Sequence, residues 1–345
     1  MTGPRHSIVL AERPSGTPTP ACFRLETQPL PTPASGEVLA RVIWLSLDPY
    51  MRGRMDDAKS YASPVALDAV MEGGAVAEVM TSADDRFAPG DIVTGQFGWT
   101  THGVLPANAL RRLDPALAPI QTALGVLGMP GLTAWVGLND ILRMQSGETL
   151  VVSAATGAVG SLAGQLARAR GLNVIGVAGG ADKCAYATDK LGYDACLDHR
   201  DSDAAALGAR LRDAAPNGID GYFENVGGKT LSAVLPNMNV NARIALCGMI
   251  AWYSGRNLDQ ALPLPQVWRR ILTHRLRVEG FIIFDHFQRF PAFLADVGPM
   301  VRDGQISYRE TVAEGLENAP AAFLKLLDGG NFGKQLVRIG PDPAP

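Results

Sequence analysis

The 345-residue chain contains four cysteines, no long hydrophobic run and no excess of basic residues. Cys22, Cys184, Cys196 and Cys247 lie far apart, without the spacing of a disulfide-rich secreted domain or a zinc ribbon, so we expect reduced thiols and a cytoplasmic location. No apolar run reaches the roughly 18 residues of a membrane span, and no signal-peptide pattern opens the chain. The net charge of −3 argues against a nucleic-acid-binding surface.

The chain is long enough for two domains, and 47% hydrophobic with 19% charged residues is typical of a globular protein. Short strand patterns separated by Pro- and Gly-rich turns occupy residues 7–113. Between residues 149 and 284, six strand patterns alternate with helical segments, which predicts a parallel, doubly wound sheet. The strand patterns at 308–313 and 335–339 do not continue this alternation, so we expect the C-terminal segment to return to the β-rich unit.

The stretch from Thr149 to Lys183 reads as strand, glycine turn, helix and strand. Gly157 and Gly160 stand three residues apart in the turn, and Gly171 ends the helical pattern. Such a βαβ unit binds a dinucleotide when its backbone N–H groups meet the pyrophosphate at the helix N-terminus, where a side chain at either turn glycine would hold the phosphate off. The spacing is looser than G-x-G-x-x-G, so an ordinary strand–helix turn is the alternative.

The second strand of this unit ends in Gly179 and Gly180, without the carboxylate that usually binds the ribose hydroxyls of NAD. A 2′-phosphate would not be repelled there, and Lys183 could pair with it. Asp182 is the counter-evidence, although it suits the N-cap of the next helix. These residues favour NADP(H), and a solvated surface lysine is the alternative for Lys183.

Several motifs together resemble the zinc-independent branch of the medium-chain dehydrogenase/reductase superfamily. This branch includes the leukotriene B4 12-hydroxydehydrogenase/prostaglandin reductases and the plant double-bond reductases. The motifs run from residue 44 to 334 and are Trp44-Leu45-Ser46-Leu47-Asp48-Pro49-Tyr50-Met51-Arg52, Gly131-Leu132-Thr133-Ala134-Trp135, Ala154-Ala155-Thr156-Gly157-Ala158-Val159-Gly160, Phe223-Glu224-Asn225-Val226-Gly227-Gly228, Cys247-Gly248-Met249-Ile250, Gly280-Phe281 and Asn331-Phe332-Gly333-Lys334.

The resemblance implies an α/β fold with a GroES-like β-rich catalytic domain (1–125 and 304–345) and a Rossmann NADP-binding domain (126–303). It implies NADPH-dependent reduction of the C=C bond of α,β-unsaturated ketones or aldehydes, by hydride transfer to the β-carbon. An enzyme of this type is a 2-alkenal or 15-oxoprostaglandin 13-reductase acting on the CH–CH group of donors. The cofactor-binding positions that it implies are Gly157, Ala158, Val159, Gly160, Gly179, Lys183, His199, Asn225, Cys247, Gly248, Tyr253, Phe281 and Asn331.

Tyr253 and Tyr50 match tyrosines that line the family's substrate site, and they are our catalytic candidates, Tyr253 first. Tyr50, Arg52, Trp252 and Tyr253 are the candidate substrate-binding residues. A wall residue is the alternative reading for either tyrosine, and an ion pair with Asp48 or a neighbour is the alternative for Arg52.

The chain departs from the family pattern at three places. Asp198-His199-Arg200 replaces the usual Asn-Tyr-Lys, so that His199 could donate to the 2′-phosphate and Arg200 could add charge. A surface histidine is the alternative. Glu224 stands where relatives often have Asp, and Ala251 where they often have Ser.

No cysteine lies between residues 22 and 184, and the histidines lack ligand spacing, so we expect no metal. A zinc-free NADPH quinone reductase is the alternative function, and a non-enzymatic NADP-sensing protein is a further rival. We expect a small hydrophobic enone or enal as substrate, no nucleic-acid or membrane partner, and a homodimer. The physiological substrate is not determined by the sequence.

Overall fold

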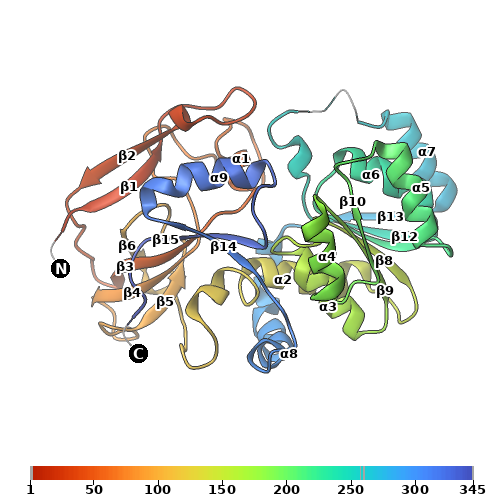
Figure 1. Cartoon of the computed structure of the whole chain (residues 1–345). Helices are drawn as coiled ribbons and strands as arrows, with labels where there is room; N and C mark the ends of the chain where they lie inside the picture. The colour runs from red at the N-terminus through yellow and green to blue at the C-terminus, as the bar shows by residue number, and fades with distance from the viewer. Residues whose placement is uncertain (1–2, 257, 259–260, 344–345) are drawn as a thin grey trace. The chain divides into compact units, whose positions relative to one another are not determined.

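The computed structural model describes residues 3–256, 258 and 261–343. The chain forms two compact units (Figure 1). The first unit combines Met1–Gly125 with Glu310–Pro345, and the second is Val126–Arg309.

The second unit is built on a six-stranded sheet in which every pair of neighbouring strands is parallel. The strand order is β10-β9-β8-β11-β12-β13. The chain therefore starts at the centre of the sheet, runs to one edge, and returns to the centre to build the other half. In such sheets ligands bind beyond the carboxyl ends of the strands, where the order reverses. The strands are β8 (Thr149–Ser153), β9 (Asn173–Ala178), β10 (Ala195–Asp198), β11 (Ile219–Glu224), β12 (Met238–Leu246) and β13 (Arg277–Gly280).

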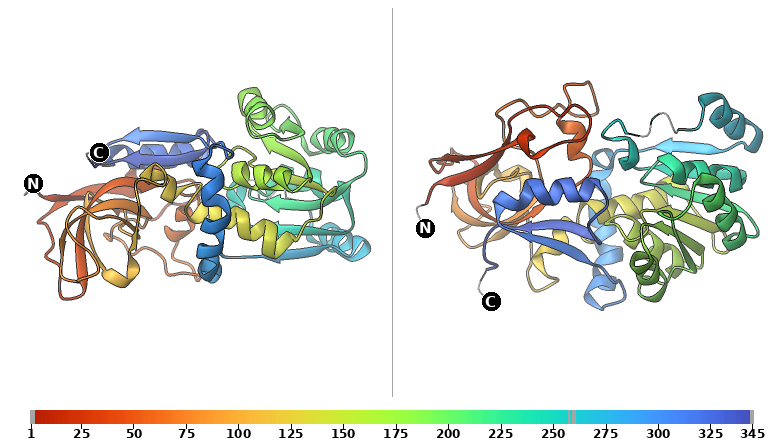
Figure 2. Two further views of the ribbon diagram at one scale, coloured as in Figure 1. Left: turned by 90° about the horizontal axis from the view of Figure 1, so that it is seen from below. Right: turned by 45° about the horizontal axis from the view of Figure 1, so that its top comes forward.

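Helices cover both faces of this sheet, as Figures 1 and 2 show. Alternate residues of each strand point to opposite faces, so Leu150 and Val152 belong to one hydrophobic core and Val151 to the other. The first core includes residues of α2 (Met129–Val136), α3 (Gly160–Ala169), α4 (Ala181–Asp189) and α8 (Phe290–Arg302); the second includes residues of α5 (Ala204–Ala214), α6 (Gly228–Val234) and α7 (Leu264–His274). The predicted doubly wound parallel sheet is confirmed.

The first unit is β-rich, also as predicted, and its main sheet has the order β14-β15-β3-β4-β5-β7, with β6 also paired to β3. β15 runs antiparallel to β3, with Leu336 opposite Ser46, so the end of the chain completes a sheet that its beginning starts. A separate ribbon pairs β1 with β2. The bounds are β1 (Arg5–Leu10), β2 (Phe23–Gln28), β3 (Glu37–Ser46), β4 (Ala75–Ser82), β5 (Ile92–Gly95), β6 (His102–Pro106), β7 (Arg111–Arg112), β14 (Glu310–Glu314) and β15 (Lys334–Arg338).

An aromatic cluster fills the core of the first unit next to α9 (Ala319–Leu327) and the short α1 (Met51–Arg54). Trp99 stacks on Phe23, with ring centroids 5.6 Å apart, and Phe323 of α9 meets Trp99 edge-on at 5.6 Å. These contacts join the N-terminal ribbon, the middle of the chain and its C-terminal helix.

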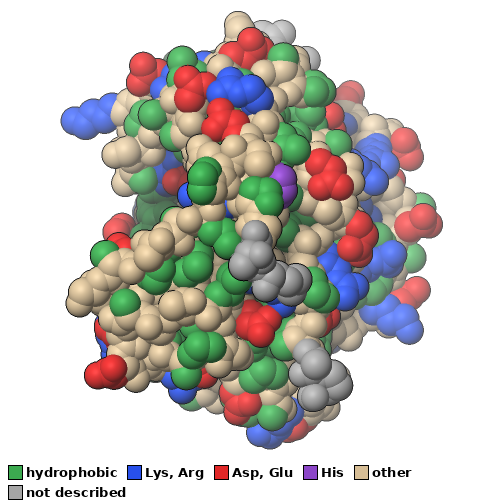
Figure 3. Space-filling model, turned by 90° about the vertical axis from the view of Figure 1, so that its left-hand side faces the viewer, with side chains coloured by type: hydrophobic (Ala, Val, Ile, Leu, Met, Phe, Trp, Pro, Cys, Tyr) green, Lys and Arg blue, Asp and Glu red, His purple; other side chains and the backbone are tan. Residues whose placement is uncertain are grey.

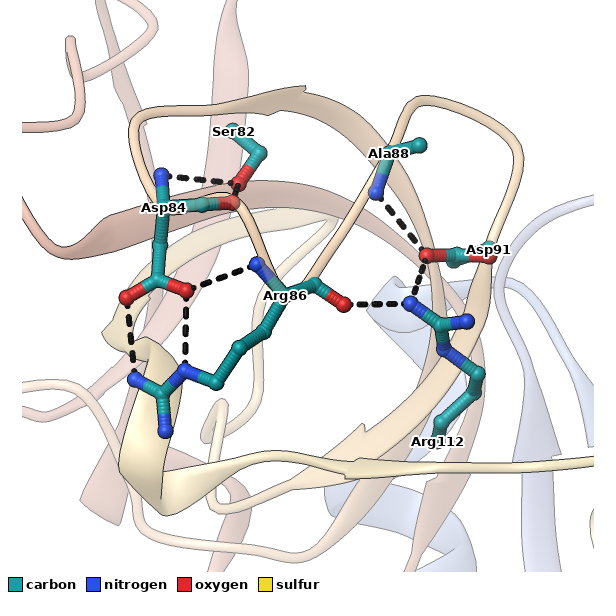
Figure 4. A network of polar contacts seen from close by, with 6 residues as sticks. All are labelled: Ser82, Asp84, Arg86, Ala88, Asp91 and Arg112. Atoms are coloured by element: carbon teal, nitrogen blue, oxygen red, sulfur yellow. Dashed lines mark hydrogen bonds and ion pairs between the residues drawn. The ribbon is translucent and has the colours of Figure 1, made fainter.

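Charged side chains close the turn that links β4 to β5 (Figure 4). Asp84 accepts from the guanidinium of Arg86 at 2.8 Å, and this pair lowers the pKa of Asp84 to about 2. Asp91 accepts from the backbone N–H of Ala88 at 2.9 Å and pairs with Arg112 at 2.7 Å. Acidic and basic side chains are also interspersed over the face of the molecule drawn in Figure 3.

Three local features differ from what the residue pattern alone predicts. The helical spacing over 124–142 predicts a helix that Pro130 interrupts, but Pro130 lies in the first turn of α2, where its missing N–H costs nothing. The apolar pattern predicts a strand at 243–247, but β12 begins five residues earlier, at Met238. Residues Leu264–His274 form helix α7, which the residue pattern alone did not single out. Among the described residues, no helix is long and apolar enough to cross a bilayer.

Candidate functional site

The glycine turn after β8 is shaped by contacts of the backbone with itself. Ala154 adopts a positive φ of 49°, and a Cβ added to Gly160 would lie 2.4 Å from the carbonyl oxygen of Ala154. Gly157 donates its N–H to the same oxygen at 2.8 Å. Gly160 is therefore required by the turn itself, and its role in admitting a phosphate stays a prediction. Ala158 and Val159 complete the turn and are partly exposed.

A buried hydrogen-bond network joins the carboxyl ends of β8 and β11. The hydroxyl of Ser153 donates to Oε1 of Glu224 at 3.0 Å and accepts from the N–H of Asn225 at 2.8 Å. The side-chain amide of Asn225 donates back to the carbonyl of Ser153 at 2.8 Å. Asn225 is thus held at the point where the strand order reverses, the predicted position for a residue that binds a nucleotide ribose.

Glu224 fixes the loop that follows Asn225. Its Oε1 also accepts from the N–H groups of Val226 at 2.7 Å and Gly227 at 3.0 Å. The side chain is 1% exposed, and burial raises the pKa of the carboxyl against the opposing effect of these donors. A carboxylate at this depth orders the loop at the cost of its own desolvation.

A second loop, residues 247–253, packs on the first. The N–H groups of Cys247 and Gly248 both donate to the carbonyl of Glu224, at 2.9 and 3.1 Å. The phenol oxygen of Tyr253 accepts from the N–H of Met249 at 3.2 Å, and it lies 3.1 Å from the position of a Cβ added to Gly248. The Tyr253 hydroxyl is thereby held beside the backbone of Gly248. Burial raises the pKa of the Cys247 thiol to about 12, so this thiol is inert at neutral pH.

Two aromatic side chains complete this edge of the sheet. The indole of Trp252 lies against Gly227, because a Cβ added there would meet the ring at 2.8 Å. Phe281, after β13, packs edge-on against Phe223 with centroids 6.4 Å apart. The carboxyl ends of β11, β12 and β13 therefore carry a group of the residues predicted from the sequence. They are Asn225, Cys247, Gly248, Tyr253 and the two aromatic residues Trp252 and Phe281.

A cluster of basic side chains gathers at the carboxyl ends of β9 and β10. A Cβ added to Gly179 would lie 3.0 Å from both Nε2 of His199 and Nε of Arg200, so these two side chains extend over the end of β9. Burial lowers the pKa of Lys183, and the charge of Arg200 lowers it further. Burial, and then the charge of Lys229, lower the pKa of His199. A dianionic group placed here would relieve this mutual repulsion.

The carboxylate of Asp198 lies near the basic cluster but accepts hydrogen bonds from the backbone. Its Oδ1 accepts from the N–H groups of Gly180 and Arg200, each at 2.9 Å. Gly180, with φ of 101°, is the N-cap of α4, and Asp182 lies in the first turn. The expectation that Asp182 caps this helix is therefore wrong, since a glycine with the required backbone conformation occupies that position.

The remaining candidates belong to the first unit. Tyr50 precedes α1, and burial, followed by the negative charge of Asp48, raises the pKa of its phenol. Arg52 is 3% exposed; it pairs with Asp56 at 2.7 Å and donates to the carbonyl of Gly16 at 2.7 Å. These are structural contacts, and its substrate-binding role stays a prediction. The side-chain amide of Asn331 donates to the carbonyl of Gly333 at 2.7 Å.

Sequence reasoning missed several residues that organise these elements. Ser153 carries no signal, because a serine at a strand end is common and its partner Glu224 is 71 residues away. The buried pair between Lys334 and Asp48, at 2.8 Å, joins the first and last motifs of the chain. The sequence signal for this pair was that Asp48 and Lys334 each belong to one of the family motifs.

The arrangement in the second unit fits a phosphorylated dinucleotide. Backbone N–H groups lie at the start of α3, an ordered loop follows β11, and a basic cluster stands where a 2′-phosphate would need it. In the part of the chain that the structure describes, no group of three or more His, Cys, Asp or Glu residues could hold a metal ion.

Comparison with known proteins gives matches along nearly the whole chain. Residues 6–113 match a model described as the N-terminal domain of oxidoreductase, and residues 158–297 one described as zinc-binding dehydrogenase. The chain is 47% identical to an NADPH-dependent curcumin reductase of Escherichia coli, over 97% of this chain and 96% of that protein. It is 41% identical to an NADP⁺-dependent 2-alkenal reductase of Nicotiana tabacum, over 88% of each. A crystal structure of CurA from Vibrio vulnificus in complex with NADPH matches with a TM-score of 0.92 at 47% identity, covering 98% of this chain and 100% of that one.

Proposed function

Because this chain belongs to the zinc-independent medium-chain dehydrogenase/reductase family of NADP-dependent double-bond reductases, we propose that it reduces the C=C bond of α,β-unsaturated ketones and aldehydes. The observation that carries the proposal is the full-length similarity to an NADPH-dependent curcumin reductase. The chain is an NADP-dependent oxidoreductase, and its cofactor is NADP(H). We assign residues 1–125 and 304–345 to the catalytic domain and 126–303 to the cofactor-binding domain.

The residues of the second unit suit this cofactor. Lys183 and His199, with Arg200 beside them, would hold the 2′-phosphate. The turn from Gly157 to Gly160 would receive the pyrophosphate at the start of α3. Asn225, Cys247, Gly248, Phe281 and, from the first unit, Asn331 would complete its binding; bound NADPH supplies the hydride.

The protein's own task is to stabilise the negative charge that builds on the carbonyl oxygen as the double bond is reduced. Tyr253 is the first candidate donor, because the Met249 N–H holds its oxygen in place and a phenol stays protonated at neutral pH. Tyr50 is the candidate from the first unit, and its raised pKa keeps the phenol protonated at neutral pH. Trp252 and Arg52 are assigned to the substrate walls.

A substrate panel tests the proposal. Enones, 2-alkenals and quinones are each assayed with NADPH and with NADH, and products are identified by mass spectrometry. We expect saturated ketones and aldehydes, formed with NADPH in clear preference to NADH. Quinone reduction without enone reduction would establish the quinone reductase instead. Cofactor binding without turnover of any substrate would refute the proposal that the chain is an enzyme.

The same assays test Tyr253. Tyr253→Phe removes only the hydroxyl, so we expect kcat to fall; loss of one such donor typically costs about 10²–10³-fold. Tyr50→Phe is the parallel variant for the first unit. A Tyr253→Phe enzyme with unchanged kcat would remove Tyr253 from the catalytic set.

The outer face of α7 supports assembly of this chain into a homodimer. Leu264, Trp268 and Leu272 follow one another at spacings of four, and they are 63%, 60% and 76% exposed. The neighbouring edge strand β13 pairs only with β12 among the described strands, and its Val278 is 43% exposed. Exposed apolar stripes beside an open strand edge are typical of subunit contacts. Size-exclusion chromatography with light scattering should show a dimer that Leu272→Glu converts to a monomer; a wild-type monomer would refute it.

Four unpaired thiols support a cytoplasmic location, where cysteines stay reduced. Fractionation of cells that express the chain, followed by detection of the enzyme and of enone reductase activity, tests it. Recovery in an exported fraction would contradict this assignment.

A further inference from the structure

Arg54 is a buried cation at the end of the short helix α1, two residues beyond the motif that ends at Arg52. Its side chain is only 3% exposed. Tyr50 immediately precedes the helix, and side chains four residues apart lie one above the other on a helical turn, so Arg54 lies on the same side of α1 as Tyr50. Arg52 lies on the opposite side of the turn, where it pairs with Asp56 at 2.7 Å.

The guanidinium of Arg54 contacts two tyrosine rings. Its central carbon, Cζ, lies 4.3 Å from the ring centroid of Tyr61 and 5.6 Å from that of Tyr50. Both distances are within the range of a cation–π interaction, which is stronger where the cation is shielded from water. Tyr61 is 50% exposed, so the guanidinium lies beneath a ring that faces solvent. The buried cation therefore ties the candidate tyrosine Tyr50 to the segment that carries Tyr61.

Polar contacts fix the orientation of the same guanidinium. Its Nε donates to Oε1 of Glu72 at 2.6 Å, and its Nη1 donates to the carbonyl of Ala62 at 3.2 Å. The backbone carbonyl of Arg54 accepts from the N–H of Val65 at 2.8 Å. A planar fork can make such hydrogen bonds at its edge while its face lies against an aromatic ring, which a lysine ammonium cannot do.

We propose that Arg54 is a positioning residue for the enone site, which holds the ring of Tyr50, and with it the phenol hydroxyl, in one orientation. The inference rests on the proposed function, in which Tyr50 contacts the substrate. Arg54 itself is buried and paired with Glu72, so it acts through the tyrosine. Without the guanidinium the Tyr50 ring can take other rotamers, and the hydroxyl leaves the place where it would meet the carbonyl oxygen of the substrate.

Steady-state kinetics test the proposal. Arg54→Met removes the charge and keeps an unbranched side chain, so we expect kcat/KM for the enone to fall about 5- to 30-fold, as for the loss of one shielded cation–π contact. The Kd for NADPH, measured by fluorescence titration, should stay unchanged. Arg41→Met is the control, because it breaks a pair of similar burial in the same unit, with Glu78 at 2.5 Å, and it should keep the wild-type kcat/KM. A folded Arg54→Met enzyme with wild-type kcat/KM for the enone, or one that loses NADPH affinity to the same extent, overturns the proposal.

Two milder variants carry the test if Arg54→Met does not fold. Arg54→Lys keeps the charge but loses the fork, and Glu72→Gln weakens a contact whose carboxylate side chain is 37% exposed. Each should lower kcat/KM for the enone several-fold, by less than Arg54→Met. In a Tyr50→Phe background no hydroxyl is left to position, so Arg54→Lys should cause little further loss. Full additivity of the two substitutions overturns the proposal.

A spectroscopic measurement separates this inference from the proposed function. The chain has seven tyrosines, and in protein labelled with 3-fluorotyrosine the Tyr50 resonance is the one that Tyr50→Phe removes from the ¹⁹F spectrum. We expect Arg54→Met to shift or broaden this resonance and Arg41→Met to leave it in place. An unchanged Tyr50 resonance in Arg54→Met overturns the proposal even if the wild type reduces enones. A changed resonance in a protein that reduces no enone would refute the proposed function while showing that Arg54 holds Tyr50.

Discussion

The buried ion pair between Lys334 and Asp48 shows how strongly the first and last motifs of the chain depend on each other. Lys334 is 4% exposed and Asp48 6%. The ammonium group donates to Oδ1 of Asp48 at 2.8 Å and to the carbonyl of Leu47 at 2.6 Å. The hydroxyl of Ser46 donates to the second carboxylate oxygen. Lys334→Met removes the cation, keeps most of the side-chain volume, and leaves a buried carboxylate without its counter-charge.

Breaking a buried pair in this way costs about 3–5 kcal/mol. Because about 1 kcal/mol shifts the midpoint of a 150–250-residue protein by about 2–4 °C, we expect Lys334→Met to lower Tm by about 6–20 °C. Differential scanning calorimetry at neutral pH measures the shift. Arg86→Met, which breaks the exposed pair with Asp84, is the control and should leave Tm nearly unchanged.

The double variant Asp48→Asn with Lys334→Met separates the pair from the packing around it. Replacing both charges removes the desolvated carboxylate, so the double variant should recover at least half of the loss caused by Lys334→Met alone. Simple addition of the two single losses would show that the charges do not interact. A Tm shift below 2 °C for Lys334→Met would refute the reasoning.

Further predictions follow from the second unit. Arg200→Met should raise the KM for NADPH about 10- to 100-fold and leave that for NADH unchanged, because a charge-assisted hydrogen bond contributes about 1.5–3 kcal/mol; equal effects on both cofactors would contradict it. A 2′-phosphate would raise the lowered pKa of His199, so binding takes up a proton and the Kd for NADPH rises with pH; His199→Gln, titrated by fluorescence, should flatten that rise. The pKa of Glu224 is raised in the folded state, so between the unfolded-state pKa and the folded-state pKa the folded protein holds a proton that the unfolded chain has released. In that pH range this group makes the free energy of unfolding fall as pH rises. Urea unfolding of Glu224→Gln should lack this contribution. Gly160→Ala should cost about 1–3 kcal/mol through its clash with a backbone oxygen, whereas Gly298→Ala, in open space, should not destabilise.

The fold was largely predictable because each of its elements is encoded locally. Apolar runs bounded by Gly and Pro predict both ends of four strands of the doubly wound sheet to within one residue. The exceptions are the start of β12, five residues earlier than predicted, and the end of β13, three residues earlier than predicted. The sequence did not predict the start of β12 because polar residues, Asn239 and Asn241 among them, alternate along the exposed beginning of the strand and interrupt its apolar pattern. Helix α7 was not predicted because its apolar residues include an exposed stripe as well as a partly buried one.

The candidate site was less predictable because its contacts are not local. The motif containing Asn225 indicated a role, but the Ser153 hydroxyl that positions it precedes it by 72 residues. The ion pair of Lys334 and Asp48 spans 286 residues. A pattern of residue types can nominate such groups, but only the paired strands bring them into contact.

The structure also changes which residues explain the preference for a phosphorylated cofactor. The glycine turn after β8 is required by its own backbone, since Gly160 lies against Ala154, and such a turn would serve NAD as well as NADP. Discrimination between NADP and NAD must therefore come from residues outside this turn. The basic side chains over Gly179 are groups of the second unit whose charge fits a 2′-phosphate. Those side chains are carried by α4 and by the loop after β10.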